Sequence, residues 1–211
     1  MQNLMSTHFA VFLAAAVVLA ITPGPGLAYV VARTAAGGAR EGVASSLGTA
    51  LGGMGHVVAA ALGLSALVAQ SATAFTVVKY VGACYLLYLG MRILFASEPA
   101  PASVAVRAAG PARAFWEGVL VELLNVKTAL FFLAFIPQFV DANASPASQF
   151  IFLGTICVAL NTSADLLAVA GVSRLSRSSA ASAVRARILA AGSGVTLMLL
   201  GAYVALSGRD R

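Results

Sequence analysis

The sequence has very little charge for its length. Only 9% of its 211 residues are charged, whereas 60% are hydrophobic and the mean hydropathy is +0.93. A soluble globular domain usually has about 25% charged residues. The low charge therefore argues against a water-soluble fold. It favours a chain of membrane-spanning helices, each of which needs about 20 apolar residues.

Cysteines and clusters of basic residues are also scarce. The two cysteines, Cys84 and Cys157, lie within apolar segments and show no metal-ligand or disulfide spacing. We interpret them as small buried hydrophobic residues, and we expect neither a metal site nor a cofactor. The net charge is +6, but the arginines are scattered over short polar loops without interleaved aromatic residues. We therefore expect no nucleic-acid partner.

Catalytic motifs are absent as well. The sequence contains neither H-E-x-x-H nor G-x-S-x-G, and no two aspartates are paired inside an apolar segment. Glu122 and Asp165 would form an acid pair only through an unusual packing of their helices. We therefore expect no catalytic residues and no enzymatic activity, with a membrane-embedded enzyme kept as a rival interpretation.

Six apolar segments follow one another along the chain. Nothing in them alternates as a membrane β-strand would, so helices are expected. We predict an all-α integral membrane protein with six transmembrane helices. We expect no cleaved signal peptide, because nothing basic precedes Phe9 except the amino terminus. The segments comprise about 8–33, 42–69, 75–95, 115–140, 148–172 and 187–207.

A polar stretch divides these segments into two groups of three. Residues 96–113 read ASEPAPASVAVRAAGPAR, and their Ala and Pro content is typical of a linker. We predict a first three-helix half at 1–95, a cytoplasmic linker at 96–114 and a second half at 115–211. Because three helices reverse the direction of the chain across the membrane, the halves would form an inverted repeat, a common transporter plan.

A short internal similarity favours this repeat. ALGGMGHVVAA at 50–60 aligns without gaps with ALNTSADLLAV at 159–169, so that His56 corresponds to Asp165. The match is weak by itself, because alanine and leucine coincide by chance in apolar sequence. It therefore supports the repeat without establishing it.

Positive charges are distributed unequally between the loops. Nine Lys and Arg residues fall on one side of the predicted helices and three on the other. Loops rich in positive charge stay in the cytoplasm. We therefore expect a protein of the bacterial inner membrane with both termini outside. The first set comprises Arg33, Arg40, Arg92, Arg107, Arg113, Arg174, Arg177, Arg185 and Arg187, and the second comprises Lys79, Arg209 and Arg211.

The first apolar segment is interrupted by TPGPG at residues 22–26. Proline lacks an amide proton and clashes with the preceding turn, so this stretch should unwind the helix. The freed backbone groups must be buried in protein or line a wet cavity. The half-helix ends carry partial charges that suit a zwitterion, although a purely structural kink is the alternative. The candidate substrate-binding residues here are Thr22, Pro23, Gly24, Pro25 and Gly26.

The fourth segment carries Glu122, Asn125 and Lys127 well inside its apolar sequence. Ionisable groups at such positions usually face the interior of a helix bundle. Glu122 and Lys127 lie about 140° apart around a regular helix, so they share a face only if the helix bends between them. Glu122 alternatively snorkels to the cytoplasmic surface. Asn125 and Lys127 are candidates for substrate binding.

The fifth segment places Asn161 and Asp165 on one helical face. Asp165 lies near mid-membrane and needs a partner or a proton, and Lys127 is its natural partner. We therefore expect contact between Lys127 and Asp165, either as a structural pair or as part of a proton-carrying site. Asn161 joins the candidates for substrate binding. Asp165 is the first candidate for coupling to protons, followed by Glu122 and His56.

The second segment presents one face with Gly48, Gly52, His56 and Gly63. The glycines permit close packing against another helix. A lone histidine in such a face is more often a satisfied core residue than a site residue. The third segment holds three residues expected to anchor the helix at the membrane interface or to pack against neighbours: Lys79, Tyr85 and Tyr88.

Four stretches resemble the LysE/RhtB family, the exporters of lysine, homoserine, threonine and similar amino acids. They are ITPGP in the first segment, GTALGGMGHVVAAALGLSAL in the second, KYVGACYLLYLGMRIL in the third and FWEGVLVELLNVKTALFFLAFIPQFV in the fourth. The resemblance implies a secondary transporter that exports small amino acids, powered by the proton gradient. Its partners would be an amino acid, protons and membrane lipid, with a homodimer as one open option.

Two departures from the family pattern fall at the expected site. Val126 stands where the family usually has the proline of N-P-K, which weakens the expectation of a second helix break. Gly26 stands where the family usually has Asn or Asp, which removes a possible substrate-binding side chain. An assembly subunit and a metal-ion exporter are the other rival interpretations. A divalent cation, however, would want more carboxylate or thiolate ligands at one depth.

Overall fold

The computed structural model describes residues 2–64, 107–141 and 144–174, with isolated positions between 73 and 91 and at 198 and 202. All regular secondary structure in these parts is helical, as expected of an all-α membrane protein. Several predictions concern residues outside the described ones: most of segments 75–95 and 187–207, most of the linker 96–114, Lys79 and Tyr85.

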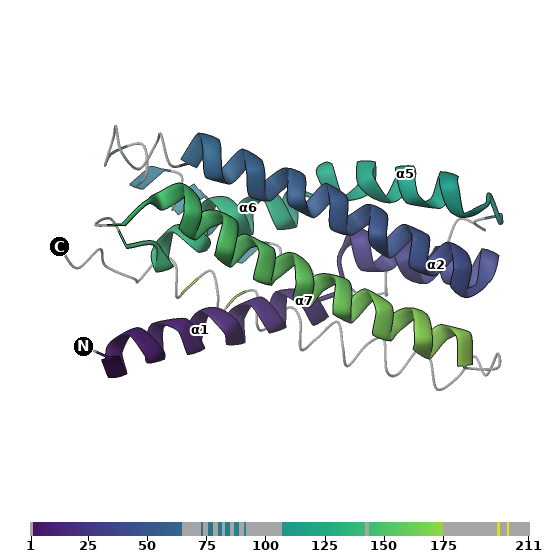
Figure 1. Cartoon of the computed structure of the whole chain (residues 1–211), viewed down its shortest axis with the longest axis horizontal. Helices are drawn as coiled ribbons and strands as arrows, with labels where there is room; N and C mark the ends of the chain where they lie inside the picture. Colours follow the sequence, from purple (N-terminus) through teal and green to yellow (C-terminus); the bar gives the residue numbers. More distant parts are fainter. Residues whose placement is uncertain are drawn as a thin grey trace.

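Two of the described helical stretches are long and apolar enough to cross a membrane. One is the 39-residue stretch Pro25–Gly63, formed by α2 (Pro25–Ala59) and the π-helical turn η1 (Ala60–Leu64). The other is α7 (Pro146–Arg174), with 29 residues. These helices run along the long axis of the molecule (Figure 1).

Two further stretches are shorter or broken. A third candidate span consists of α5 (Pro111–Leu123) and a second piece, Val126–Phe139, bent by 47° relative to it. The second piece contains α6 (Val126–Ala134) and the 3-10 turn η2 (Ile136–Phe139). α1 (Gln2–Ile21) contains a shorter apolar stretch. The helical membrane architecture is confirmed, whereas the six-helix count and the inverted repeat stay predictions.

The first helix break lies where the two prolines predict it. α1 ends at Ile21, and α2 begins at Pro25 after an extended Gly24. Pro25 occupies the first turn of α2, where a missing amide proton costs no helical hydrogen bond. The prediction that TPGPG unwinds the first segment is therefore confirmed.

α2 folds back on itself at Gly38, whose φ is 76°, a region that favours glycine. In a straight helix, Gly26 and Thr49 would lie about 35 Å apart at 1.5 Å per residue. Instead, a β-carbon built on Gly26 would lie 3.8 Å from Thr49 Cγ2. α2 therefore consists of two antiparallel arms, 25–37 and 39–59. The first arm continues the broken first segment, and the second arm belongs to the predicted second segment.

Glycines bring the second arm of α2 into close contact with α5. A β-carbon on Gly52 would lie 2.7 Å from the Val119 carbonyl oxygen, and one on Gly48 would overlap the carbonyl of Phe115. A larger residue at either position would push the helices apart. The predicted packing face is confirmed at these two glycines, whereas a β-carbon on Gly63 would meet no atom within 4 Å in the part of the chain that the structure describes.

Buried phenylalanines join α1 to α6, η2 and α7. Phe131 and Phe135 stack with their ring centroids 4.7 Å apart, and Phe12 meets Phe139 edge-on at 5.4 Å. Phe150 of α7 belongs to the same core cluster. Aromatic pairs of this kind add to the stabilisation from packing. This apolar cluster fixes α1 and α6 relative to each other, and the two helix breaks lie at their facing ends.

Candidate functional site

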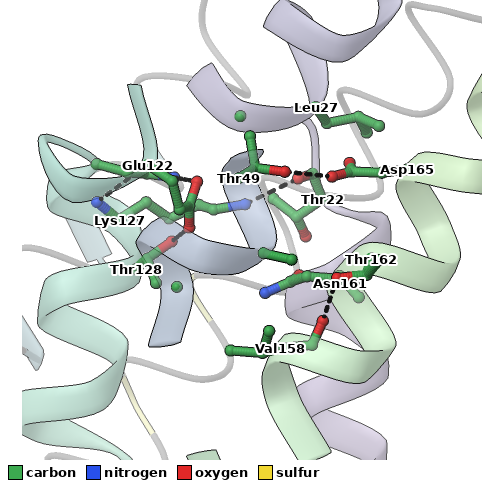
Figure 2. A pocket seen from close by; sticks show the side chains of 15 residues that line it. Thr22, Leu27, Thr49, Glu122, Lys127, Thr128, Val158, Asn161, Thr162 and Asp165 are labelled. Atoms are coloured by element: carbon green, nitrogen blue, oxygen red, sulfur yellow. Dashed lines mark hydrogen bonds between the residues drawn. The ribbon is translucent and has the colours of Figure 1, made fainter. Parts of the chain in front are cut away.

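A small polar cavity lies between the two helix breaks (Figure 2). Its volume is about 30 Å³, which is room for roughly two water molecules. An amino acid would therefore need the surrounding helices to open. The predicted site residues on its wall are Thr22, Gly26, Glu122, Asn125, Lys127, Asn161 and Asp165.

Three predicted residues of the first break lie off this wall. Pro23, Gly24 and Pro25 do not line the cavity, whereas Thr22 and Gly26 on either side of them do. Gly24 lies instead beside the ammonium group of a lysine from α6, as described below. Thr22 and Gly26, on either side of the break, therefore form part of the cavity wall. Substrate binding by Pro23, Gly24 and Pro25 stays a prediction.

Lys127 reaches from the start of α6 to the end of α1. Its Nζ donates to the Thr22 carbonyl at 2.9 Å and lies 3.4 Å from the Leu19 carbonyl oxygen. Carbonyls in the last turn of a helix lack helical partners and carry partial negative charge. The buried ammonium thereby supplies a donor to the Thr22 carbonyl at the first break, whereas the Leu19 carbonyl also accepts from the Thr22 amide at 3.3 Å.

A second break separates α5 from α6 without a proline. Leu124 and Asn125 interrupt the helix, and Asn125 Oδ1 accepts the amide proton of Lys127 at 3.1 Å. Asparagine is among the strongest N-caps, so it starts a new helix at this point. The second helix break is therefore present although Val126 replaces the proline of the family pattern, and the weaker expectation of a break at this position is wrong. The resulting bend of 47° brings Glu122 and Lys127 to the same cavity, although they are five residues apart.

Glu122 is buried beside this second break. Its Oε1 accepts from the Thr128 hydroxyl at 2.6 Å, and its Oε2 accepts from the Asn125 side-chain amide at 3.0 Å. Only 7% of the residue is exposed, so the alternative of a glutamate that snorkels to the surface is wrong. The carboxylate instead links the end of α5 to the start of α6.

His56 lies behind the second break and off the cavity wall. Its Nε2 is 2.8 Å from the carbonyl oxygen of Glu122, and its ring centroid is 6.3 Å from that of Phe132. This placement agrees with the interpretation of His56 as a core residue that packs between α2 and α5 and whose ring nitrogen has a hydrogen-bond partner. A role for His56 in carrying protons stays a prediction.

Asp165 enters the cavity from α7, on the side opposite Glu122 (Figure 2). Its Oδ2 lies 3.0 Å from Thr49 Oγ1, which also lies 2.8 Å from the Ser46 carbonyl oxygen. The ion pairs of the described residues include none between Asp165 and Lys127. The expected direct contact is therefore wrong: the two residues share a cavity without pairing.

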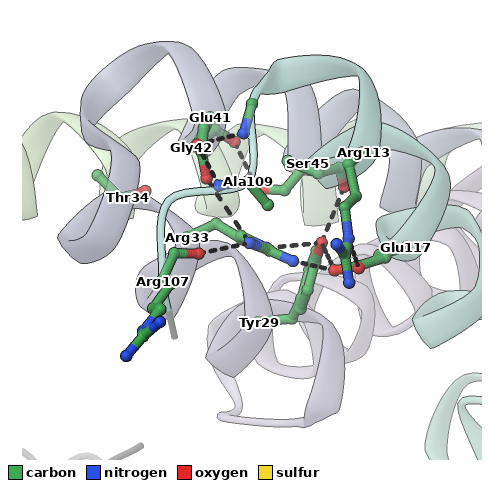
Figure 3. Close-up of polar contacts among 12 residues, drawn as sticks. Tyr29, Arg33, Thr34, Glu41, Gly42, Ser45, Arg107, Ala109, Arg113 and Glu117 are labelled. Atoms are coloured by element: carbon green, nitrogen blue, oxygen red, sulfur yellow. Dashed lines mark hydrogen bonds and ion pairs between the residues drawn. The ribbon is translucent and has the colours of Figure 1, made fainter. Parts of the chain in front are cut away.

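A second buried charge cluster lies at the turn of α2 (Figure 3). Arg33 donates through Nε to the Tyr29 hydroxyl at 2.9 Å, and its Nη2 pairs with Glu117. Its Nη1 donates to the Arg107 carbonyl at 3.2 Å and lies 3.7 Å from Glu41 Oε2. The arginine that the sequence suggests as a loop charge is thus buried and fastens the turn to α5.

Glu41 supplies the cap that α5 lacks. Its Oε1 accepts from the backbone amides of Ala109 at 2.9 Å and Gly110 at 2.7 Å. Gly110 is the N-cap residue of α5 and has no side chain to do this. The contacts of Glu41 with Ala109 and of Glu117 with Arg33 span 68 and 84 residues, so no local pattern in the sequence marks them. The pair of Glu117 with Arg113, four residues away, is the local one.

Residues 17–208 match the family described as LysE type translocator. The chain belongs to this family. The LysE-family expectation from the four sequence stretches is therefore confirmed, and the protein is a translocator and not an enzyme.

Relatives of this LysE-family chain include efflux proteins. It is 33% identical to an uncharacterized membrane protein of Vibrio cholerae over 150 residues, 71% of this chain and 73% of that protein. It is 29% identical to the leucine efflux protein of Salmonella typhimurium over 143 residues, 67% and 68% of the two chains. It is 27% identical to the homoserine/homoserine lactone efflux protein of the same organism over 197 residues, 92% and 94% of the two chains. No solved structure matches the chain.

Proposed function

We propose that the protein exports amino acids or close derivatives across the cytoplasmic membrane by proton antiport. The observation that carries this proposal is the cavity between the two helix breaks. One ammonium, from Lys127, and two carboxylates, from Glu122 and Asp165, line it without pairing with one another. Charged groups inside a membrane protein are costly and usually mark a substrate or ion pathway.

An amino acid carries charges complementary to this wall. In the proposed complex, the substrate carboxylate binds Lys127, and the substrate ammonium binds Asp165 and the Thr22 carbonyl. Asn161 lies on the same wall, and its amide can donate to or accept from either end of the substrate. Because these groups come from α1, α6 and α7, the cavity must open between helices to admit the amino acid.

Asp165 is the proposed coupling residue. When Asp165 is ionised, Thr49 can donate to it at 3.0 Å; when it is protonated, Thr49 can turn to the Ser46 carbonyl at 2.8 Å. A hydroxyl has one proton, so these two arrangements exclude each other and each suits one protonation state. Protonation removes the charge that holds the substrate ammonium, which favours release and ties export to proton entry.

Counterflow in liposomes tests this proposal. Liposomes that contain the purified protein are loaded with an unlabelled amino acid and diluted into the labelled one, with leucine and homoserine as the first probes. We expect transient accumulation of label, absent from protein-free liposomes and absent with a labelled sugar. No exchange across a panel of amino acids would contradict the proposal.

We also propose that the chain forms two inverted three-helix halves, 1–95 and 115–211, joined by a cytoplasmic linker at 96–114. One helix break in each half supports this arrangement, and the unequal loop charges support an inside position for the turn at residue 38. Ala39→Cys, in a variant without Cys84 and Cys157, places a thiol at an exposed position of that turn. It should resist an impermeant thiol reagent in intact cells, and ready labelling would reverse the orientation.

A further inference from the structure

We propose that the ammonium of Lys127 is a built-in cation that takes the place of the substrate ammonium when the cavity is closed and carries no amino acid. Gly24 is the positioning residue that makes this possible. The inference rests on the proposed function, and it concerns the step in which the carrier returns across the membrane without an amino acid.

The partners of Lys127 are the first argument. Its ammonium contacts the Thr22 carbonyl at 2.9 Å and the Leu19 carbonyl at 3.4 Å, at the negative end of α1. Two carboxylates line the same cavity, yet neither pairs with it. The lysine therefore occupies the carbonyl end of a broken helix, which is a position suited to the ammonium of a substrate.

Gly24 is the second argument. A β-carbon built on Gly24 would lie 2.8 Å from Nζ of Lys127 and 3.0 Å from its Cε. The backbone there is extended, with φ of −146° and ψ of −179°, so its conformation does not require glycine. The Lys127 ammonium fills the space beside Gly24, so any side chain at this position would displace it.

The consequence concerns the closed, empty carrier. Buried carbonyls without a donor are costly, particularly inside a membrane. With Lys127 in place, the Thr22 carbonyl has a donor, the Leu19 carbonyl has one besides the Thr22 amide at 3.3 Å, and the cavity closes to about 30 Å³. A bound substrate donates to these carbonyls with its own ammonium, and Lys127 then turns to the substrate carboxylate. The contact of Lys127 with these carbonyls is therefore needed for the return step, whereas exchange of one amino acid for another needs Lys127 only as the partner of the substrate carboxylate.

Gly24→Ala separates these two steps. Exchange is measured as counterflow in liposomes, and net efflux is measured into medium without amino acid. The added methyl group pushes the ammonium off the carbonyls, so net efflux should fall about tenfold more than exchange, the effect expected from one lost hydrogen bond to a charged group. Gly171→Ala is the matched control, because a β-carbon there meets no atom of the described residues within 4 Å, and it should leave both rates unchanged.

Parallel loss of exchange and net efflux in Gly24→Ala, or no loss of either, overturns the inference. If this variant does not reach the membrane, Lys127→Ala carries the test: methylammonium should stimulate its net efflux more than its exchange, whereas tetramethylammonium, which has no N–H to donate, should not. Absence of that difference overturns the inference too. A wild-type protein that exchanges no amino acid would instead show that the proposed function itself is wrong.

Discussion

The two buried charge clusters of this protein are held in opposite ways. At the turn of α2, Arg33 pairs directly with Glu117 and lies 3.7 Å from Glu41. In the cavity, Lys127 contacts backbone carbonyls and Asp165 contacts a hydroxyl, with no ion pair between them. Arg33 and Asp165 are almost equally buried, at 5% and 6% exposure. Burial therefore does not distinguish the clusters, but the partners do.

The difference supports a structural role for the turn cluster and the proposed binding of substrate by the cavity cluster. In an ion pair, each charge already has an opposite charge beside it, and breaking the pair leaves the other charge buried and uncompensated. A charge held by neutral groups still gains when an opposite charge arrives. The turn cluster is therefore suited to fasten α2 to α5, and the cavity cluster is suited to exchange its partners for the two ends of an amino acid.

The largest expected effect comes from removing the cavity ammonium. Lys127→Met should lower amino-acid exchange about 100-fold or more, as expected when one partner of a buried charged contact is lost. Arg113→Met is the control, because its side chain is 70% exposed and pairs with Glu117 outside the cavity. Exchange per folded molecule should stay near the wild-type rate in that control. Similar losses in both variants would remove the distinction between the clusters.

A smaller effect is expected at Gly26, which faces the Glu122 carboxylate. A β-carbon there would lie 2.6 Å from Glu122 Oε2, so Gly26→Ala should displace the carboxylate and reduce exchange about tenfold, the cost of roughly one charged hydrogen bond. Adding Glu122→Asp shortens the side chain and should restore part of the rate. A double variant no better than Gly26→Ala would show that Glu122 is not the group displaced.

The smallest effect on transport is expected from the turn cluster. Glu41→Gln keeps the shape of the side chain but removes the charge that caps α5, so the free energy of unfolding should fall by about 1.5–3 kcal/mol. Thermal unfolding in detergent measures this, with Arg40→Gln, which removes a charge at an exposed position, as the control. Exchange per folded molecule should stay near the wild-type rate. Lost exchange with unchanged stability would place Glu41 in the transport machinery.

A local signal in the sequence marks each of the two helix breaks. The prolines at 23 and 25 predict the first break because their missing amide protons act within one helical turn. The second break does not depend on a proline at position 126, since the side chain of Asn125 starts α6 by itself. N-cap chemistry is as local as proline chemistry, so this signal was present in the sequence beside Val126.

The partners of the charged residues could not be predicted in the same way. Lys127 bonds to a carbonyl 105 residues away and Thr49 contacts a carboxylate 116 residues away. The sequence indicates that Lys127 and Asp165 share a site, because charges in a membrane protein gather away from lipid. It does not indicate that each is held by a neutral group, since that depends on how α1, α2 and α7 pack.

The central claim is that Asp165 couples amino-acid movement to protons, and an imposed pH gradient tests it most directly. Asp165→Asn keeps the shape of the side chain and removes its titrating charge. Liposomes with wild-type protein should accumulate labelled amino acid against its gradient when the pH gradient is imposed. Liposomes with Asp165→Asn should only equilibrate the label. Accumulation by Asp165→Asn at the wild-type level would contradict the account and make Glu122 or His56 the next candidate.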